Sequence, residues 1–238
     1  MLSKNLLKYV RSLHQKKFRI AHESFIVEGI KPVNELCHSN FKVDYIFSIA
    51  QHAAGFHDVI HVSKADMERM SLMKSPPGVL AVAQIPSRKQ RPQIQLPALL
   101  LDDINDPGNL GTLIRTAEWF GMKQLLITSK TADEFNPKCV QASMGSIFRM
   151  EVIRLDEKDL LDINESFIGL DLQGESLYDH QVEPVIYVLG RESAGLSAEI
   201  RERCMKMVTI PGKGETESLN AAIAGGLLMS EIFRKPMS

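Results

Sequence analysis

An amide and a long cationic side chain lie close together in the stretch DDINDPGNLGTLIRT, where an apolar run at residues 98–103 ends. Pro107 and the neighbouring glycines predict a tight turn, and we expect Asn109 to be the N-cap of the helix that follows. Arg115 lies six residues further on, so its side chain can reach back toward the turn. Such a helix start is suited to binding an anion. A capped turn whose arginine pairs with a surface carboxylate is the alternative interpretation.

Two later loops also combine glycines with polar side chains. LGRESAGL places Glu192 between glycines, which allow the backbone to approach another group closely. IPGKGETESLN ends in Ser218 and Asn220 at a predicted helix start, and the small residues at 221–226 predict close helix packing. The spacing in neither loop matches a nucleophile elbow or a phosphate-binding P-loop. A capped helix docked tightly on a sheet is the alternative interpretation of the last loop.

These loops are positioned by apolar runs that alternate with helical patterns across residues 98–238. Several runs are apolar without period-two alternation, as is typical of strands buried on both faces of a parallel sheet. We therefore predict a mostly parallel α/β sheet, with ligands in the loops at the carboxyl ends of its strands. The predicted strands cover residues 98–103, 124–128, 167–172, 185–190 and 207–210, and the predicted helices cover 110–120 and 218–234.

The first half of the chain predicts a separate, small α/β domain over residues 1–86. A segment rich in Pro and Gln, residues 87–97, has little to bury and is expected to link it to a second domain over residues 98–238. Within the first domain, the predicted helices cover 2–13, 64–73 and a segment ending at 36, and the predicted strands cover 25–29, 43–50 and 79–85.

Charge is divided unevenly along the chain, although the net charge is −1. Residues 1–97 carry 14 Lys and Arg against 7 Asp and Glu, together with six of the seven histidines. This excess indicates a polyanionic partner, and a solvated basic face is the alternative. The spacings of the histidines match no common set of metal ligands, so no metal site is expected.

The composition excludes several classes of protein. With 44% hydrophobic and 24% charged residues, the chain is neither disordered throughout nor a coiled coil. No window approaches the roughly 18 apolar residues that a membrane helix needs. The N-terminus lacks the pattern of a secretory signal, so we expect a cytoplasmic protein. Cys37, Cys139 and Cys204 form no CxxC pair, which predicts reduced thiols.

Taken in order, the three loops resemble the motifs of the SpoU-type (TrmH-like) RNA ribose 2′-O-methyltransferases of the SPOUT superfamily. Asn109, Gly111 and Arg115 match the first motif, and ASMGSIFR at residues 142–149 is similar to an intermediate stretch. The second and third motifs are matched by Gly190, Glu192, Gly195 and Leu196 and by Pro211, Gly214, Ser218, Leu219 and Asn220. Upstream, KKFRIAHESFIVEGIKPVNEL resembles the small RNA-substrate domain that often precedes the catalytic domain.

The resemblance implies transfer of a methyl group from S-adenosyl-L-methionine to a ribose 2′-hydroxyl in transfer or ribosomal RNA. It also implies a C-terminal trefoil knot, direct displacement without a metal, and a homodimer with the active site near the subunit interface. The cofactor is expected against the second and third loops, lined by Leu189, Gly190, Gly195, Ile210, Pro211, Ser218 and Leu219.

The family's catalytic roles carry over onto five residues. Arg115 is expected to contact the phosphate of the target nucleotide and to help activate its 2′-hydroxyl. Because a guanidinium group is effectively always protonated, we expect positioning rather than general-base chemistry. Asn109 and Ser218 are expected to orient Arg115 or the ribose, while Asn220 supports its loop and Glu192 anchors the motifs.

In the basic half, Lys16, Lys17 and Arg19 are expected to bind RNA phosphates without reading sequence. Unpaired or looped RNA is the expected target, because a hydroxyl must enter a pocket. Three other functions stay open: a non-catalytic RNA-binding or ribosome-assembly factor with this fold, a base methyltransferase of the superfamily, and a dinucleotide-dependent oxidoreductase. The retained polar residues of the motifs argue against the first, and the missing GxGxxG pattern argues against the last.

Overall fold

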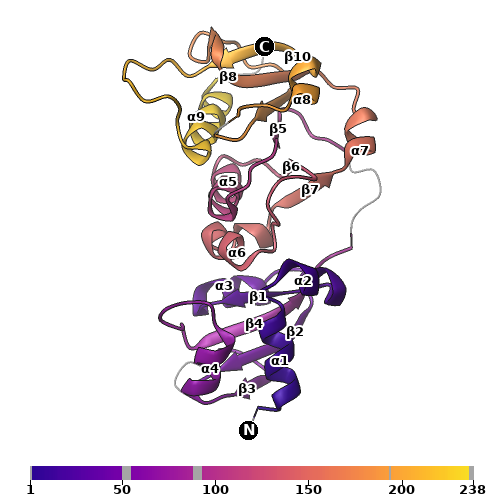
Figure 1. Ribbon diagram of the computed structural model, residues 1–238, viewed down its shortest axis with the longest axis vertical. Helices are drawn as coiled ribbons and strands as arrows, with labels where there is room; N and C mark the ends of the chain where they lie inside the picture. The colour runs from indigo at the N-terminus through magenta and orange to yellow at the C-terminus, as the bar shows by residue number, and fades with distance from the viewer. Residues whose placement is uncertain (1, 50–54, 88–92, 193, 236–238) are drawn as a thin grey trace. The chain divides into compact units, whose positions relative to one another are not determined.

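The chain forms two compact units (Figure 1). The computed structural model describes residues 2–49, 55–87, 93–192 and 194–235. The first unit comprises Met1–Arg88 and Asp133–Phe148, and the second comprises Lys89–Ala132 and Arg149–Ser238. The sequence predicts one continuous domain over 98–238, whereas residues 133–148 pack with the first unit. The expected linker, 87–97, includes residues 88–92, which lie outside the described part of the chain.

A four-stranded sheet forms the centre of the first unit, in the order β1–β4–β2–β3. Strand β4 runs antiparallel to both of its neighbours, and β3 runs parallel to β2. Val, Ile and Phe dominate these segments and suit a pleated surface that is buried by helices. The bounds are β1 (Ser24–Glu28), β2 (Val43–Ser48), β3 (Val59–His61) and β4 (Val79–Gln84).

Amphipathic helices accompany this sheet. The Ser3 hydroxyl caps the first of them by accepting the N–H of Leu6 at 3.1 Å. Leu7 and Val10 of that helix then pack in one core cluster with Phe47 of the sheet. The helices are α1 (Lys4–Ser12), α2 (Lys16–His22), α3 (Ile30–Cys37) and α4 (Lys64–Met70).

Residues 133–148 add helix α6 (Pro137–Ser143) and the 3-10 helix η2 (Ser146–Phe148) to the first unit. Helix α6 packs on β1. Phe135 and Phe148 join Phe25 in a ring cluster, with centroids 4.7 Å apart for Phe25–Phe135 and 6.5 Å apart for Phe25–Phe148. Aromatic pairs of this kind contribute about 0.5–1.5 kcal/mol beyond their buried area. The segment is therefore held by the core of the first unit.

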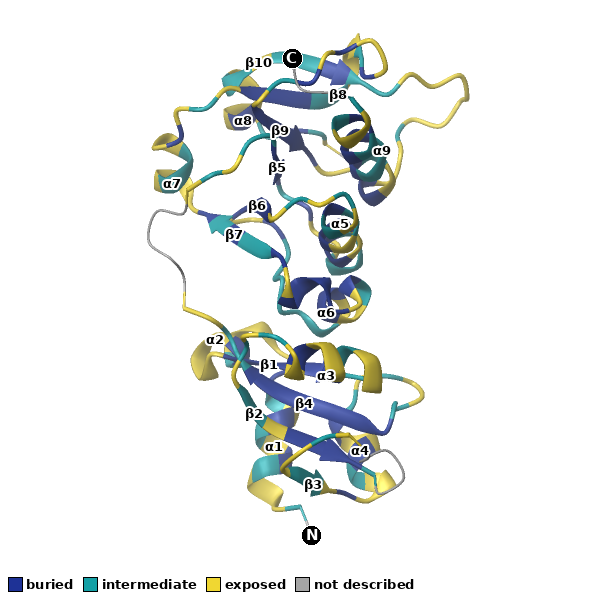
Figure 2. Ribbon diagram, turned by 180° about the vertical axis from the view of Figure 1, so that it is seen from behind, coloured by how far each residue is buried: buried dark blue, intermediate teal, exposed yellow. Residues whose placement is uncertain are grey.

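The second unit is built on a six-stranded sheet in the order β10–β8–β9–β5–β6–β7. All of its strand pairs are parallel. The central strands are buried along their whole length (Figure 2), as their continuous apolar runs predict. The strands are β5 (Ala98–Leu101), β6 (Gln124–Thr128), β7 (Glu151–Leu155), β8 (Phe167–Ser176), β9 (Ile186–Leu189) and β10 (Cys204–Thr209). The predicted parallel α/β architecture is confirmed.

Two helices of the second unit, α5 and α9, pack against each other beside the sheet (Figures 1 and 2). A Cβ at Gly225 would lie 2.4 Å from Leu113 Cδ2, so glycine permits this approach. The close packing predicted for the small residues at 221–226 is thereby confirmed, while the trefoil knot stays a prediction. The helices are α5 (Pro107–Trp119), α7 (Glu157–Leu161), α8 (Ala198–Arg203) and α9 (Ala221–Arg234).

Candidate functional site

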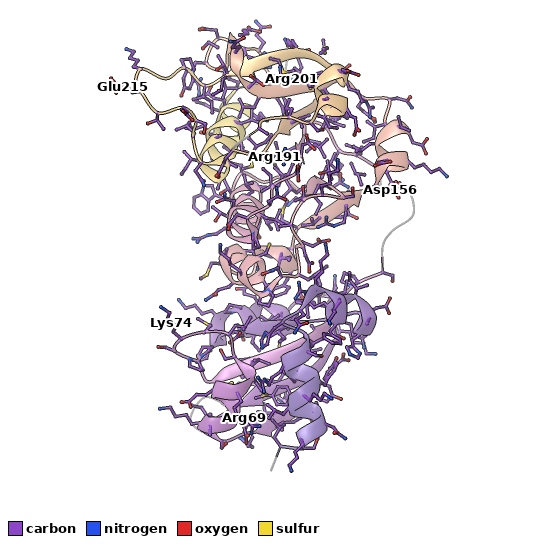
Figure 3. The ribbon with its side chains drawn as sticks, viewed as in Figure 1. Arg69, Lys74, Asp156, Arg191, Arg201 and Glu215 are labelled. Atoms are coloured by element: carbon purple, nitrogen blue, oxygen red, sulfur yellow. The ribbon has the colours of Figure 1, made fainter. Side chains whose placement is uncertain are left out.

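The three predicted loops follow the ends of β5, β9 and β10 in the second unit. Strands β5 and β9 are neighbours with Leu101 opposite Leu189, so the loops after them begin side by side. Strand β10 ends at Thr209, and residues 210–220 form a loop that projects from the unit with Glu215 near its tip (Figure 3). That loop returns to the sheet at the start of α9.

The Glu192 carboxylate joins all three loops. Its Oε1 accepts hydrogen bonds from Asn109 Nδ2 (2.7 Å), Asn220 Nδ2 (2.7 Å) and the N–H of Ala221 (2.8 Å). Asn220 Nδ2 also donates to Asn109 Oδ1 at 3.2 Å. Hydrogen bonds to a charged acceptor are roughly twice as strong as neutral ones. Three predicted site residues that are far apart in the sequence therefore meet at one oxygen atom.

The start of α5 differs from the expectation. Asp106, not Asn109, is the N-cap, because its Oδ1 accepts the N–H of Asn109 at 2.9 Å and Pro107 is the first helical residue. Proline is favoured there because the first helical position needs no N–H donor and the proline φ is already helical. With the cap supplied by Asp106, the Asn109 amide reaches across to Glu192.

Asn220 serves two elements at once. Its Oδ1 caps α9 by accepting the N–H of Ala222 (3.0 Å) and of Ile223 (3.4 Å), while its Nδ2 donates to Glu192. The helix therefore begins at Ala221 rather than at residue 218, where the sequence places it. Ser218 consequently lies in the loop before the helix.

Glycines make the loop after β9 compact. The N–H of Gly195 donates to the Arg191 carbonyl at 2.9 Å, and Gly195 has a φ of +65°. A Cβ at Gly190 would lie 2.3 Å from the carbonyl carbon of Gly195, so Gly190 requires glycine, while the positive φ of Gly195 favours it. Arg191, labelled in Figure 3, forms an ion pair with Asp103 at 3.0 Å. This pair ties the loop after β9 to the loop after β5.

Arg115 and Ser218 are open to a ligand. Arg115 is exposed on α5, and Ser218 is half-buried in the loop before α9. Within the part of the chain that the structure describes, neither side chain has a hydrogen-bond or ion-pair partner. The orientation of Arg115 by Asn109 and Ser218 stays a prediction for the complex with substrate.

The residues expected at the cofactor lie at the ends of β9 and β10 and along the loop before α9. Leu189 and Gly190 are buried, Gly195, Ile210 and Ser218 are half-buried, and Pro211 and Leu219 are exposed. These residues supply aliphatic side chains together with main-chain donors and acceptors. That combination suits the polar edges and apolar faces of an adenosine group. The residues present therefore fit S-adenosylmethionine, and their contacts with it are a proposal.

Arg19 is not available for the expected role in RNA binding. It is only 1% exposed, and its Nε donates to Asp133 Oδ2 at 2.9 Å. Its Nη1 donates to the carbonyls of Leu13 (2.9 Å) and His14 (3.0 Å). The guanidinium therefore stabilises the turn between α1 and α2. Lys16 and Lys17 are exposed and stay predicted RNA contacts.

The sequence does not predict the roles of two aspartates at the end of β5. Asp102 is 3% exposed and accepts the N–H of Ser197 at 2.7 Å, and Asp103 has a φ of +59°. Their partners lie in the loop after β9, so the local sequence carries no signal for them. The cap at Asp106 does have a signal, because Asp followed by Pro is a typical helix start.

The described residues were expected to hold neither a membrane helix nor a metal site. Among the described residues, no helix is long and apolar enough to cross a bilayer. In the same part of the chain, no group of three or more His, Cys, Asp or Glu side chains is placed to hold a metal ion. No disulfide joins the described residues Cys37, Cys139 and Cys204, and burial raises the pKa of the Cys204 thiol to about 11.

Known proteins are similar to this chain in sequence and in fold. The SpoU rRNA Methylase family matches residues 97–230, and the MRM3-like substrate binding domain matches residues 4–81. The 23S rRNA (guanosine(2553)-2′-O)-methyltransferase RlmP of Bacillus subtilis is 30% identical over 230 residues, with 92% of each chain covered. An uncharacterized tRNA/rRNA methyltransferase of Mycobacterium ulcerans is 32% identical over 204 residues, and the match covers 79% of this chain and 66% of that protein.

Solved structures of the same fold complete the comparison. A TrmH-family protein from Porphyromonas gingivalis has a TM-score of 0.88 at 36% identity, covering 98% of this chain and 99% of that chain. An rRNA methyltransferase from Sinorhizobium meliloti, solved with S-adenosylmethionine bound, has a TM-score of 0.85 at 28% identity, covering 100% and 97%. The resemblance carried by the three motifs is thus confirmed, and the chain belongs to the SpoU rRNA methylase family.

Proposed function

We propose that this protein transfers a methyl group from S-adenosylmethionine to a ribose 2′-hydroxyl of ribosomal or transfer RNA. The observation that carries the proposal is the meeting of Asn109, Glu192 and Asn220 at one carboxylate oxygen. Arg115 is exposed on α5, the same helix that carries Asn109. The name of the Bacillus subtilis relative, which specifies a 2′-O product on 23S ribosomal RNA, supports ribose over base chemistry.

We assign binding of the RNA substrate to Arg115. Its guanidinium is exposed and, among the described residues, has no internal partner, so its donors are available to a phosphate oxygen. A fixed positive charge close to the ribose lowers the cost of the alkoxide that forms as the 2′-hydroxyl attacks. A guanidinium group is a poor proton acceptor, so the hydroxyl proton leaves to water or to another base.

The other polar residues position the reacting groups. Glu192 holds the Asn109 and Asn220 amides and so fixes the loops after β5 and β10 relative to the loop after β9. Ser218 lies in the loop before α9 and is assigned to orient the ribose. Alignment of the attacking oxygen with the methyl group supplies a large part of the rate enhancement, because the reaction is a direct displacement.

The loops after β9 and β10 would hold the cofactor, which supplies an electrophilic methyl group on a sulfonium when bound. Gly190 and Gly195 keep the first loop thin, so that its main-chain groups face the ligand. Leu189, Ile210 and Leu219 supply aliphatic surface for the adenine ring. With main-chain recognition of this kind, a Cβ at Gly190 is expected to abolish cofactor binding.

A homodimer is the second part of the proposal. Apolar side chains on α5 and α9 face solvent, with Trp119 84% exposed, Phe233 68% and Ile223 57%. Phe233 also contacts the ring of Phe120, with centroids 5.8 Å apart. Exposed apolar side chains on two helices that pack together are consistent with a protein interface. A second copy of the chain is the occupant that the family resemblance implies.

Trp119 reports on this dimer directly, because it is the only tryptophan of the chain. Dilution of the protein is expected to shift its fluorescence to the red as the indole re-enters water. Sedimentation over the same concentration range is expected to show dissociation. A monomer at all concentrations, with constant Trp119 emission, contradicts the dimer.

The reaction itself is tested with S-adenosylmethionine that carries a labelled methyl group. Unmodified transfer RNA, ribosomal RNA and ribosomal particles are supplied in separate reactions, and the product is hydrolysed with alkali. We expect label in alkali-resistant dinucleotides, which form only beside a methylated 2′-oxygen. Label on the bases would indicate a base methyltransferase. No transfer and no cofactor binding would favour a non-catalytic RNA-binding protein.

A further inference from the structure

A row of four aromatic rings runs across α1, α2 and β2 in the first unit. Tyr45 and Tyr9 have centroids 6.3 Å apart, Tyr9 meets His22 edge-on at 5.1 Å, and His22 stacks with Phe18 at 6.4 Å. These four residues, Tyr45, Tyr9, His22 and Phe18, are called the aromatic row below. The three elements lie together on one side of the unit in both views (Figures 1 and 2).

The aromatic row lies at the surface rather than in the core. His22 and Tyr45 are exposed, and Tyr9 and Phe18 are half-buried. By contrast, Phe25, which belongs to a separate ring cluster in the same unit, is completely buried. The rings of the row therefore serve packing only in part, and each residue of the row keeps some exposure to solvent.

Positive charge accompanies the row. Lys17 Nζ lies 4.8 Å from the centroid of the Phe18 ring, and Lys16 beside it is exposed. Of the carboxylates in the neighbouring sequence, Asp44 already accepts a hydrogen bond from Gln84 Nε2 at 2.8 Å, and Glu23 is exposed after α2. Tyr9 meets both His22 and Tyr45 edge-on, with interplanar angles of 87° and 70°, so the row offers separate rings rather than one flat surface. Partly exposed rings beside lysines combine the two features that bind unpaired nucleic acid: aromatic groups for stacking and cations for phosphates.

We infer that the aromatic row binds an unpaired segment of the RNA substrate by stacking its bases, with Lys16 and Lys17 on the adjoining phosphates. A duplex hides the faces of its bases and offers this surface only its phosphates. The row therefore selects single-stranded or looped RNA over a helix. The inference rests on the proposed function in one respect, because it takes RNA as the substrate of this chain.

Ring-removing variants of the full chain separate stacking from packing. Phe18→Leu and Tyr45→Leu delete a ring but keep apolar volume, whereas Tyr45→Phe keeps the ring. Tyr178→Leu is a matched control, because Tyr178 is a 47% exposed tyrosine of the second unit. The probes are a fluorescein-labelled oligouridine of twelve nucleotides, which stays unpaired, and an RNA duplex of equal length, with binding followed by anisotropy.

The expected result is a loss of oligouridine affinity of about 5- to 150-fold in each leucine variant, the range for one stacked base. Tyr45→Phe and Tyr178→Leu are expected to bind like the wild type. The duplex is expected to bind more weakly than oligouridine and to be insensitive to the leucine substitutions. Circular dichroism checks that the variants are folded. If one of the leucine variants is unfolded, His22→Gln, at an exposed position of the row, is used in its place.

Two results would overturn the inference: unchanged oligouridine binding in the folded leucine variants, or equal affinity of the wild type for the duplex. Methyl transfer by the wild type is measured on the same preparation. Transfer by the wild type with unchanged binding in the variants removes the inference and leaves the proposed function intact. If the variants bind oligouridine more weakly but the wild type transfers no methyl group to any RNA, the aromatic row is kept as an RNA-binding surface and the proposed function is removed.

Discussion

The second unit exposes its polar cluster, whereas the first unit buries one. Glu192, which is exposed, meets Asn109 across 83 residues of sequence, and Arg115 on the helix of Asn109 is exposed as well. Arg19 meets Asp133 across 114 residues and is 1% exposed, with two main-chain carbonyls using its remaining donors. An arginine whose donors are consumed within the protein supports the fold, and one whose donors stay open is available to a ligand.

The largest effect predicted from this contrast is on stability. Arg19→Ala leaves Asp133 and the carbonyls of Leu13 and His14 without their partner. Removing one member of a buried pair costs about 3–5 kcal/mol, so the free energy of unfolding in urea is expected to fall by that amount. The control is Arg69 (Figure 3), an exposed residue whose Nη1 lies 3.5 Å from Asp66 Oδ1. Its substitution by Ala is expected to cost less than about 1 kcal/mol.

A second prediction concerns the exposed cluster. Glu192→Ala removes the acceptor of three hydrogen bonds, so the motif loops lose their common anchor and kcat/KM is expected to fall about 10- to 100-fold. Glu192→Gln keeps an acceptor oxygen and is expected to lose less. Glu215→Ala, at the loop tip in Figure 3, is the matched control. Equal activities for Glu192→Ala and Glu215→Ala would remove the cluster from the mechanism.

A smaller effect is expected from the exposed lysines beside Arg19. Lys16→Ala with Lys17→Ala removes two phosphate contacts, so the slope of log K against log salt for single-stranded RNA is expected to flatten by about 1.4. The free energy of unfolding is expected to stay at the wild-type value, unlike that of Arg19→Ala. A wild-type salt slope in the double variant would show that RNA binds elsewhere.

The smallest predicted effect tests a buried group of the second unit. Burial, and then the Lys206 ammonium, lower the pKa of His180, whose Nε2 lies 3.0 Å from the Tyr187 hydroxyl. Because the unfolded chain takes up the proton near pH 6.5, the contribution of His180 to stability is present above that pH and is lost below it. His180→Gln is therefore expected to lose less stability between pH 7.5 and pH 5.5 than the wild type in thermal unfolding. An identical loss would assign the pH dependence to other groups.

The sequence predicts the fold best where apolar runs are long and uniform. The buried strands β5, β6 and β9 and the helices α5 and α9 lie within a few residues of their expected positions. The sequence does not predict strand β7, because Glu151 and Arg154 interrupt its apolar pattern. It does not predict helix α2 either, because the seven residues of that helix are mostly polar and Arg19 is buried by ion pairing rather than by apolarity.

The site shows what local sequence cannot predict. Spacing identified Asn109, Glu192 and Asn220, but the atom at which they meet depends on the register of strands far apart in the chain. The role of Arg19 depends likewise on Asp133, and a basic composition made it look like an RNA contact. Charge counts predict a partner class, whereas burial decides which charges reach that partner.

In the proposed mechanism, Arg115 acts on the RNA and not on the fold or on the cofactor. The most direct test compares Arg115→Ala with Arg234→Ala, an exposed arginine that pairs with Glu231 within α9. Single-turnover methyl transfer and S-adenosylmethionine affinity are measured for both. We predict that Arg115→Ala lowers the transfer rate about 100- to 1,000-fold with unchanged cofactor affinity and melting temperature, while Arg234→Ala behaves like the wild type. A wild-type transfer rate in Arg115→Ala, or a loss explained by weaker cofactor binding, would contradict the account.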